Sequence, residues 1–250
     1  YFNKSMDLNN KFPNTFFNMA IILNLLNKKK ESIQFFKSYI ELQPNNIEAY
    51  YSLGICYREI GDIQMAEKTF LKALKMNPDY PYLKGQLQFM KNHLCDWVNY
   101  NETKQNIEKD ITQNKKTITP WQALSVIDSP KLLKDNTMLF IDNKEFNNQN
   151  LIDKKKITLG YFSPDFCEHA VSNQFKQILK LHDKKKFEIV GFYLNSKQDE
   201  KLYKIKTYFD KFFDINQMNT EDIIRLTQIN EVDIAIDLAG YTYSNRYQIF

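Results

Sequence analysis

The feature that most constrains this chain is a period of 34 residues in its first third. Residues 47–80 read IEAYYSLGICYREIGDIQMAEKTFLKALKMNPDY, and residues 13–46 follow the same pattern less closely. Each copy places large apolar residues at helical spacing, small residues where two helices would touch, and a proline near its end. The period predicts two stacked helical hairpins. The matching positions are Phe16, Met19, Ala20, Leu23, Ser32, Phe36, Tyr39 and Pro44, paired in order with Tyr50, Leu53, Gly54, Tyr57, Ala66, Phe70, Ala73 and Pro78.

This pattern resembles the tetratricopeptide repeat, in which two helices form one unit. A single unit cannot bury its apolar face alone, so each repeat needs a neighbour. We therefore expect residues 80–95 to form a further helix that caps the stack, and residues 6–10 to be the tail of an earlier repeat. The resemblance implies a repeat segment over residues 1–95, whose inner face, lined by the first helices, would hold an extended peptide.

From about residue 154 the chain changes to alternating strands and helices. Apolar runs predict the strands, and the third helix is expected to have Thr220 as its N-cap. Alternation of this kind predicts a parallel sheet with helices on both faces. The predicted strands are residues 157–162, 187–193, 212–214 and 232–238, and the predicted helices are residues 172–182, 200–208 and the one that begins near Thr220.

Two loops of this region follow predicted strands and carry polar side chains. The first, G-Y-F-S-P-D-F-C-E-H at residues 160–169, includes the end of the first strand, and the second, D-L-A-G-Y-T at residues 237–242, includes the end of the last. Parallel strands place their carboxyl ends on one edge of the sheet, where such sheets bind ligands. We therefore expect both loops to face the same cleft.

The two loops resemble segments of the O-linked N-acetylglucosamine transferases, a family in which tetratricopeptide repeats precede a two-lobed glycosyltransferase. On this resemblance the chain is identified as a fragment of a bacterial-type member that ends within the first catalytic lobe. The implied fold class is α + α/β, with helical repeats followed by a Rossmann-like parallel-sheet lobe, the amino-terminal lobe of a GT-B type glycosyltransferase. Residues 96–153 would be a helical linker region, and residues 154–250 the incomplete lobe.

The resemblance implies an inverting transfer of N-acetylglucosamine from UDP-GlcNAc to Ser and Thr hydroxyls of proteins, with the repeats binding the acceptor protein. UDP-GlcNAc is the implied donor substrate, and neither a cofactor nor a metal is expected. Residues 1–250 alone are expected to be inactive, because most donor contacts of this family lie in the second lobe. The alternative is a non-catalytic repeat scaffold for protein–protein interaction whose α/β lobe is degenerate.

The resemblance also suggests residues of a catalytic site. His169 is the catalytic candidate, either as a base or as a residue that positions the reacting groups. Asp165, Gly240, Tyr241 and Thr242 are the substrate-binding candidates. For two of them a structural role is the alternative: Asp165 would hold its loop by hydrogen bonds to backbone amides, and Gly240 would allow the turn.

Candidates for peptide binding lie in the repeats. In this family an asparagine on the inner face grips the backbone of the bound peptide. Asn18 matches that position in residues 13–46, whereas Ser52 occupies it in residues 47–80. Both are predicted to contact an acceptor peptide.

The linker region contains two further stretches that resemble family segments, residues 94–111 and the TPWQAL stretch at residues 119–124. Their tryptophans, Trp97 and Trp121, are interpreted as core aromatics. The polar stretch FNNQN at residues 146–150 is predicted to be a solvated loop.

Composition argues against several other classes of protein. The net charge of +4 is small for 250 residues, and no stripe of basic and aromatic residues suggests a nucleic-acid partner. Cys56, Cys95 and Cys167 form no zinc spacing, which favours a reducing compartment over a disulfide framework. No run of about 18 apolar residues is present, so no membrane partner is expected and a cytoplasmic location is predicted. The glycine signatures of dinucleotide and phosphate loops are absent as well.

Overall fold

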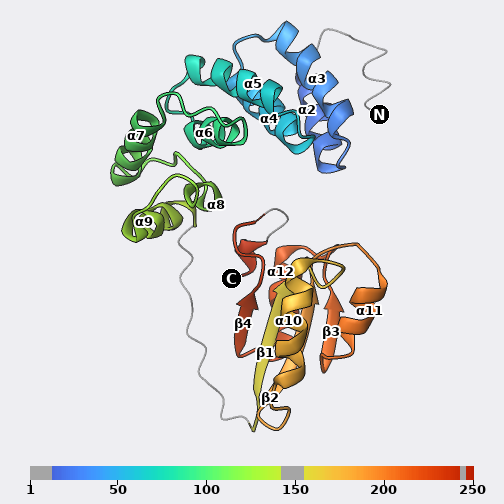
Figure 1. Cartoon of the computed structure of the whole chain (residues 1–250). Helices are drawn as coiled ribbons and strands as arrows, with labels where there is room; N and C mark the ends of the chain where they lie inside the picture. Colours follow the sequence, from blue (N-terminus) through green and yellow to red (C-terminus); the bar gives the residue numbers. More distant parts are fainter. Residues whose placement is uncertain (1–12, 142–154, 243–245) are drawn as a thin grey trace. The chain divides into compact units, whose positions relative to one another are not determined.

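The computed structural model describes residues 13–141, 155–242 and 246–250 (Figure 1). The chain divides into two compact units, Tyr1–Lys144 and Glu145–Phe250. Each unit has apolar cores of its own. The predicted repeat tail at residues 6–10 and the predicted loop at residues 146–150 lie outside the described residues.

The first unit is helical, and the first four helices that the structure describes in it form two hairpins with the predicted period. Two of these helices begin at side-chain caps. The Asn46 Oδ1 accepts a hydrogen bond from the Ala49 N–H at 2.9 Å, and the Asp62 Oδ1 accepts one from the Met65 N–H at 3.2 Å. The helices of the two hairpins are α2 (Pro13–Leu25), α3 (Lys29–Leu42), α4 (Ile47–Glu59) and α5 (Ile63–Met76).

Small residues let the helices of the second hairpin touch, as the repeat pattern predicts. A Cβ added at Gly54 would lie 2.4 Å from the Cε1 of Phe70, which is fully buried. Ala66 and Ala73 of α5 are fully buried as well. The aromatic ring of Phe70 therefore occupies the space that a side chain at position 54 would need.

Beyond the second hairpin the helices continue with a different packing. The chain forms α6 (Leu83–His93), α7 (Tyr100–Thr112), α8 (Pro120–Ala123) and α9 (Pro130–Phe140). The helix α6 falls within the segment expected to cap the stack, and it packs against α5. The helices α7 to α9 share a separate small core around Ile107, Ile111 and Ile118.

The two tryptophans of this region are not core residues. The side chain of Trp97 is 57% exposed and that of Trp121 is 50% exposed. Trp97 lies in the turn before α7 and contacts the ring of Tyr100, while Trp121 lies in the one-turn helix α8. The interpretation of both as core aromatics was wrong, because branched aliphatic residues fill that core instead.

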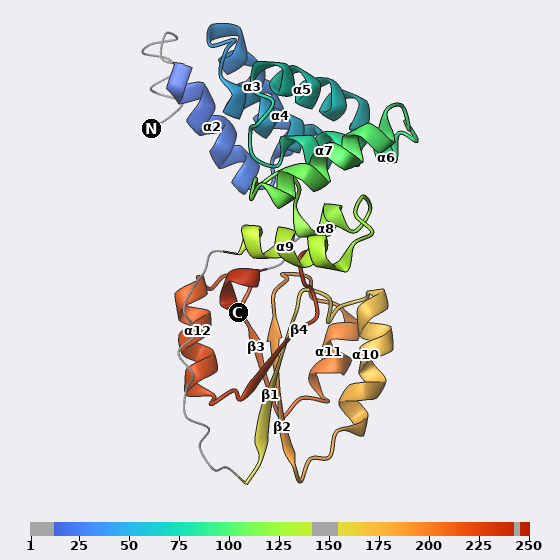
Figure 2. The same cartoon turned by 90° about the vertical axis from the view of Figure 1, so that its left-hand side faces the viewer.

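The second unit is a four-stranded parallel sheet of the order β3-β2-β1-β4, as the strand and helix alternation predicts. The strands alternate between two buried faces, so that Leu159 and Tyr161 enter one core whereas Phe162 enters the other. Figure 2 shows α10 and α11 on one side of this sheet and α12 on the other. The strands are β1 (Ile157–Ser163), β2 (Phe187–Tyr193), β3 (Lys211–Asp214) and β4 (Ile234–Asp237), and the helices are α10 (Ala170–Leu181), α11 (Glu200–Lys206) and α12 (Thr220–Ile229).

Two helices of this unit begin at other residues than predicted. The helix α10 begins at Ala170 rather than at Ser172, because the side chain of His169 acts as its N-cap. The N-cap of α12 is Asn219 rather than Thr220, and its Oδ1 accepts a hydrogen bond from the Asp222 N–H at 2.8 Å. Both corrections follow from caps that the sequence leaves ambiguous.

His182, at the carboxyl end of α10, makes the stability of this unit depend on pH. Its Nε2 shares a hydrogen bond of 2.9 Å with the Tyr161 Oη. Burial, helped by the charge of Lys184, lowers the pKa of His182 below its ordinary value. Between that lowered pKa and about 6.5 the unfolded chain binds more protons than the folded one. The stabilisation is therefore complete above about pH 6.5 and decreases as the pH falls.

Thermal unfolding of the chain at about pH 8 and about pH 5.5 tests this expectation. The second unit should unfold at a lower temperature at the acidic pH. His182→Gln keeps a polar side chain that does not titrate, so part of this pH dependence should disappear. An unchanged pH dependence in that variant would contradict the assignment to His182.

Candidate functional site

The two loops singled out by the sequence follow neighbouring strands. The strands β1 and β4 pair in parallel, with Phe162 opposite Asp237, and the Leu238 N–H donates to the Phe162 carbonyl at 3.0 Å. The loops that contain His169 and Gly240 therefore leave the sheet at the same edge. This is the edge at which parallel α/β sheets bind their ligands.

The loop after β1 is held by polar contacts along its length. The Asp165 N–H donates to the Ser163 Oγ at 3.0 Å, and the Asn195 Nδ2 donates to the Pro164 carbonyl at 3.1 Å. Asp199 accepts hydrogen bonds of 2.9 Å from both the Glu168 N–H and the Leu202 N–H. Its carboxylate thus joins the loop after β1 to the first turn of α11.

Asp199 is a supporting residue that the sequence did not single out. Hydrogen bonds from the backbone N–H groups of Glu168 and Leu202, and then Lys197, lower the pKa of its carboxyl group. Lys197 lies 3.1 Å from the Asp199 Oδ2. The position of Asp199 directly before Glu200, the first residue of α11, could have predicted it as the N-cap of that helix. Its second hydrogen bond, from the distant Glu168 N–H, could not be predicted from the sequence.

His169 has a defined hydrogen-bonding state in this loop. As the N-cap of α10, its Nδ1 accepts a hydrogen bond from the Val171 N–H at 3.3 Å. A ring nitrogen that accepts must carry a lone pair, so the neutral imidazole carries its proton on Nε2. The side chain is 48% exposed. His169 can therefore donate a hydrogen bond from Nε2 to a bound molecule.

Asp165 lies beside His169 but makes a different contact from the one expected. Its Oδ2 lies 3.6 Å from the His169 Nδ1, which is too long for a hydrogen bond. Among the described residues, no backbone amide donates to its carboxylate. The backbone N–H groups of this loop donate hydrogen bonds to the side chains of Ser163 and Asp199 instead.

The loop after β4 is a tight turn closed by its own polar groups. The Asp237 Oδ1 accepts from the Ala239 N–H at 2.8 Å, and the Thr242 Oγ1 donates to the Ala239 carbonyl at 2.7 Å. Gly240 has a φ of +55°, and no atom lies within 4 Å of a Cβ added there, so the backbone conformation rather than space requires glycine. Tyr241 and Thr242 are both half-buried.

On the repeats, the predicted peptide contacts lie on two first helices. Asn18 is exposed on α2, and Ser52 is half-buried on α4. The next residue in the same period is Gln86 on α6, which is 3% exposed. Its Oε1 accepts from the Arg58 Nη1 at 2.6 Å and from the Gln122 Nε2 at 3.0 Å. Of the three equivalent positions, Gln86 is therefore buried and already hydrogen-bonded within the protein.

Metal clusters and membrane-spanning helices are both absent from the part of the chain that the structure describes. Over residues 13–141, 155–242 and 246–250, no group of three or more His, Cys, Asp or Glu residues is arranged to hold a metal ion. Within those same ranges, no helix combines the length and the apolar character needed to cross a membrane.

Comparisons with known proteins match both units. The model of glycosyl transferase family 41 matches residues 128–250, and two tetratricopeptide repeat models match residues 13–46 and 47–80. Repeats of this kind are known for protein–protein interaction.

Curated relatives resemble part of the chain. The probable UDP-N-acetylglucosamine–peptide N-acetylglucosaminyltransferase SPINDLY of Arabidopsis thaliana is 32% identical over 102 residues, which cover 39% of this chain and 11% of that protein. The probable UDP-N-acetylglucosamine–peptide N-acetylglucosaminyltransferase SEC of the same plant is 27% identical over 97 residues, covering 38% of this chain and 10% of that protein. The matched segments thus span about a tenth of these relatives.

A solved structure shows the same fold. A mutant of the O-GlcNAc transferase of Thermobaculum terrenum aligns with 99% of this chain and 43% of its own, at a TM-score of 0.56 and 14% identity. The chain thus consists of tetratricopeptide repeats over residues 13–80 and a segment of glycosyl transferase family 41 over residues 128–250, and its relatives are named as peptide N-acetylglucosaminyltransferases.

Proposed function

We propose that the protein to which these 250 residues belong transfers N-acetylglucosamine from UDP-GlcNAc to Ser and Thr hydroxyls of other proteins, and that the repeats bind the acceptor. The observation that carries this proposal is the placement of the His169 loop and the Gly240 loop at the ends of two paired strands within a family 41 segment. Relatives named as peptide N-acetylglucosaminyltransferases support the choice of donor and acceptor.

The reaction needs a positioned acceptor and a stabilised leaving group. The acceptor hydroxyl oxygen forms a bond to the anomeric carbon while the bond from that carbon to the diphosphate oxygen breaks. The hydroxyl proton leaves to a base, and the diphosphate departs with the electron pair. Hydrogen-bond donors aimed at groups that gain negative charge lower this barrier.

In this reaction we assign His169 to positioning. Its Nε2–H is available as a donor, whereas its Nδ1 already accepts from the Val171 N–H. A base that acts through Nε2 would need the opposite tautomer, which loses the cap of α10. Asp199 would act through His169 by fixing the Glu168 backbone next to it.

An assay of sugar transfer tests the proposed function. The natural protein, with whatever sequence flanks these residues, is incubated with radiolabelled UDP-GlcNAc and a peptide that contains Ser and Thr. We expect label in this peptide and none in a matched peptide with Ala at those positions. Equal labelling of both peptides, or none with a folded protein, would count against the proposal and favour a scaffold.

Residues 1–250 by themselves are predicted to transfer no sugar in the same assay. The chain corresponds to 43% of the aligned chain of the solved transferase, so much of that protein has no counterpart here. Hydrogen bonds to a diphosphate that stays in water gain little, because the high dielectric weakens each interaction. Transfer by the 250-residue chain at a rate comparable to the natural protein would show this prediction to be wrong.

A further inference from the structure

A cavity of about 360 Å³ lies between α5, α6 and α7, within the first unit. Leu71 and Leu74 of α5 and Leu87 of α6 form its apolar wall. Polar side chains of α6 and α7 line the rest. The volume falls within the range of about 300–1,000 Å³ that is usual for ligand sites.

The cavity exists because the third helix pair departs from the repeat pattern. The position that holds Gly54 in α4 holds Gln88 in α6, and the position of Ala66 in α5 holds Tyr100 in α7. In the second hairpin the Phe70 ring fills the space over Gly54. The larger Gln88 stands at the corresponding place in α6, and α7 packs on α9 more than on α6. The space between the helices therefore stays open.

Gln88, which lines this cavity, has an unmet hydrogen-bond acceptor. The residue lines the cavity and is 1% exposed. Its Nε2 donates to the Asn92 Oδ1 at 2.7 Å, whereas its Oε1 has no hydrogen-bond partner in the described part of the chain. A buried acceptor without a partner has lost its hydrogen bonds to water without replacement, which costs stability. A bound molecule that offers an N–H group would recover part of this cost.

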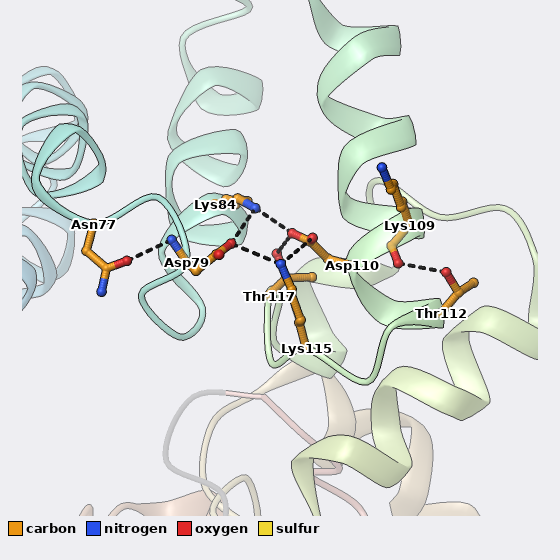
Figure 3. Close-up of polar contacts among 8 residues, drawn as sticks. All are labelled: Asn77, Asp79, Lys84, Lys109, Asp110, Thr112, Lys115 and Thr117. Carbon is orange, nitrogen blue, oxygen red and sulfur yellow. Dashed lines mark hydrogen bonds and ion pairs between the residues drawn. The ribbon is translucent and has the colours of Figure 1, made fainter.

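Positive charge exceeds negative charge around the cavity. Its lining includes Lys84, Lys91, Lys109 and Lys115 but a single acid, Asp110. Figure 3 shows that Lys84 and Lys115 both contact Asp110. The Nζ atoms of the two lysines lie 2.6 Å and 3.7 Å from the Asp110 carboxylate. They also lie 3.4 Å and 3.3 Å from the Asp79 carboxylate. These two lysines are therefore already neutralised.

Lys109 is the cation left for a ligand. Its side chain extends away from the Asp110 group in Figure 3, and within the described residues it has no ion-pair partner. Lys91, by contrast, lies 3.3 Å from the Asp96 Oδ2. The cavity thus combines one free ammonium group, one free amide oxygen and a leucine wall.

We propose that this cavity binds a short acidic segment of a partner polypeptide. A carboxylate of the segment pairs with Lys109, a peptide N–H faces the Gln88 Oε1, and an apolar side chain packs on Leu71, Leu74 and Leu87. Among the residues that the structure describes, no aromatic side chain lines the cavity, which therefore offers no stacking surface for the bases of a nucleic acid.

The cavity is distinct from the face that carries Asn18 and Ser52. The equivalent residue of that face in α6 is Gln86, and two residues along a helix turn through about 200°. Gln88 therefore points away from the Gln86 face. A partner in the cavity leaves the proposed acceptor face free, so this inference does not depend on the proposed transferase activity.

Fluorescence anisotropy with the 250-residue chain tests the proposal. The probe is a labelled ten-residue peptide of alternating Glu and Leu, and its neutral control has Gln in place of every Glu. We expect the acidic peptide to bind and the neutral one to bind much more weakly. Lys109→Glu and Gln88→Leu should each weaken binding about fivefold or more. Lys131→Glu, an equal charge change on α9 outside the cavity, should leave binding unchanged.

Thermal unfolding checks that the variants fold, and Lys109→Met replaces Lys109→Glu if the latter does not. Three results would overturn the proposal. The neutral peptide could bind as tightly as the acidic one, or Lys131→Glu could weaken binding as much as Lys109→Glu does. The third result is unchanged binding of the acidic peptide by both single variants, Gln88→Leu and Lys109→Met. Displacement of the peptide by an equal concentration of inorganic phosphate would also overturn it, because the site would then be a simple anion site.

Discussion

Replacing His169 with alanine in the natural protein should lower kcat by about 10²–10³-fold, the usual effect of removing one aligned hydrogen-bond donor from a transition state. The substitution removes the Nε2–H and also the cap that the Nδ1 gives to α10. Loss of the cap costs about 1 kcal/mol of stability, which a folded lobe tolerates. Steady-state kinetics with UDP-GlcNAc and a protein acceptor measures the effect.

His169→Asn separates the two possible roles of this residue. The Asn Oδ1 can accept from the Val171 N–H, as the His169 Nδ1 does, and its Nδ2 keeps an N–H donor. An amide cannot take up the acceptor proton. We therefore expect His169→Asn to retain most of the turnover that His169→Ala loses. An equal loss in both variants would contradict the positioning role and favour proton transfer.

Replacing Gly54 with alanine should have the largest effect on the stability of the repeats. The new Cβ would lie 2.4 Å from a carbon of the Phe70 ring, which is fully buried. Overpacking of this kind costs about 1–3 kcal/mol, which corresponds to a decrease of about 3–10 °C in Tm for a unit of this size. Differential scanning calorimetry measures it.

Gly61→Ala serves as the matched control for this substitution. Gly61 has a φ of +81° and no atom within 4 Å of an added Cβ, so alanine there strains the backbone without any clash. We expect a decrease in Tm that is smaller than for Gly54→Ala. If Gly54→Ala unfolds at the temperature of the unchanged chain, the close packing of α4 on α5 is not what stabilises the hairpin.

Much of the fold was predictable because two independent periods run through the sequence. Small residues such as Gly54 and Ala66 recur at fixed spacing, and this spacing gives the hairpins. Apolar runs such as residues 187–193 gave β2 with its observed bounds. These patterns are local, so a sequence displays them directly.

The helix starts and the polar contacts of the loops were harder to predict. His169 is not among the preferred N-cap residues, and Asn219 and Thr220 are adjacent residues that can both cap. The bond from Asp199 to Glu168 joins residues far apart in the chain. Gln88 stands where the repeat pattern has a small residue, so the pattern gives it no role. That it lines a cavity is visible only once α5, α6 and α7 are placed.

The placement of the candidate site followed from topology. The parallel pairing of β1 and β4 brings the His169 and Gly240 loops to one edge of the sheet, as expected for parallel strands. The roles of single residues did not follow from topology. Thr242, for example, directs its hydroxyl at the Ala239 carbonyl of its own loop, a contact that the strand pattern does not predict.

Following both products of the reaction at once tests the proposed sugar transfer most directly. The natural protein is mixed with UDP-GlcNAc and a Ser- and Thr-containing acceptor, and UDP release and sugar incorporation are quantified together with the anomeric configuration of the new bond. An inverting transferase converts the α-linked donor into a β-linked product, with one sugar incorporated for each UDP released. Release of UDP without incorporation, an α-linked product, or neither product from a folded protein would contradict the account.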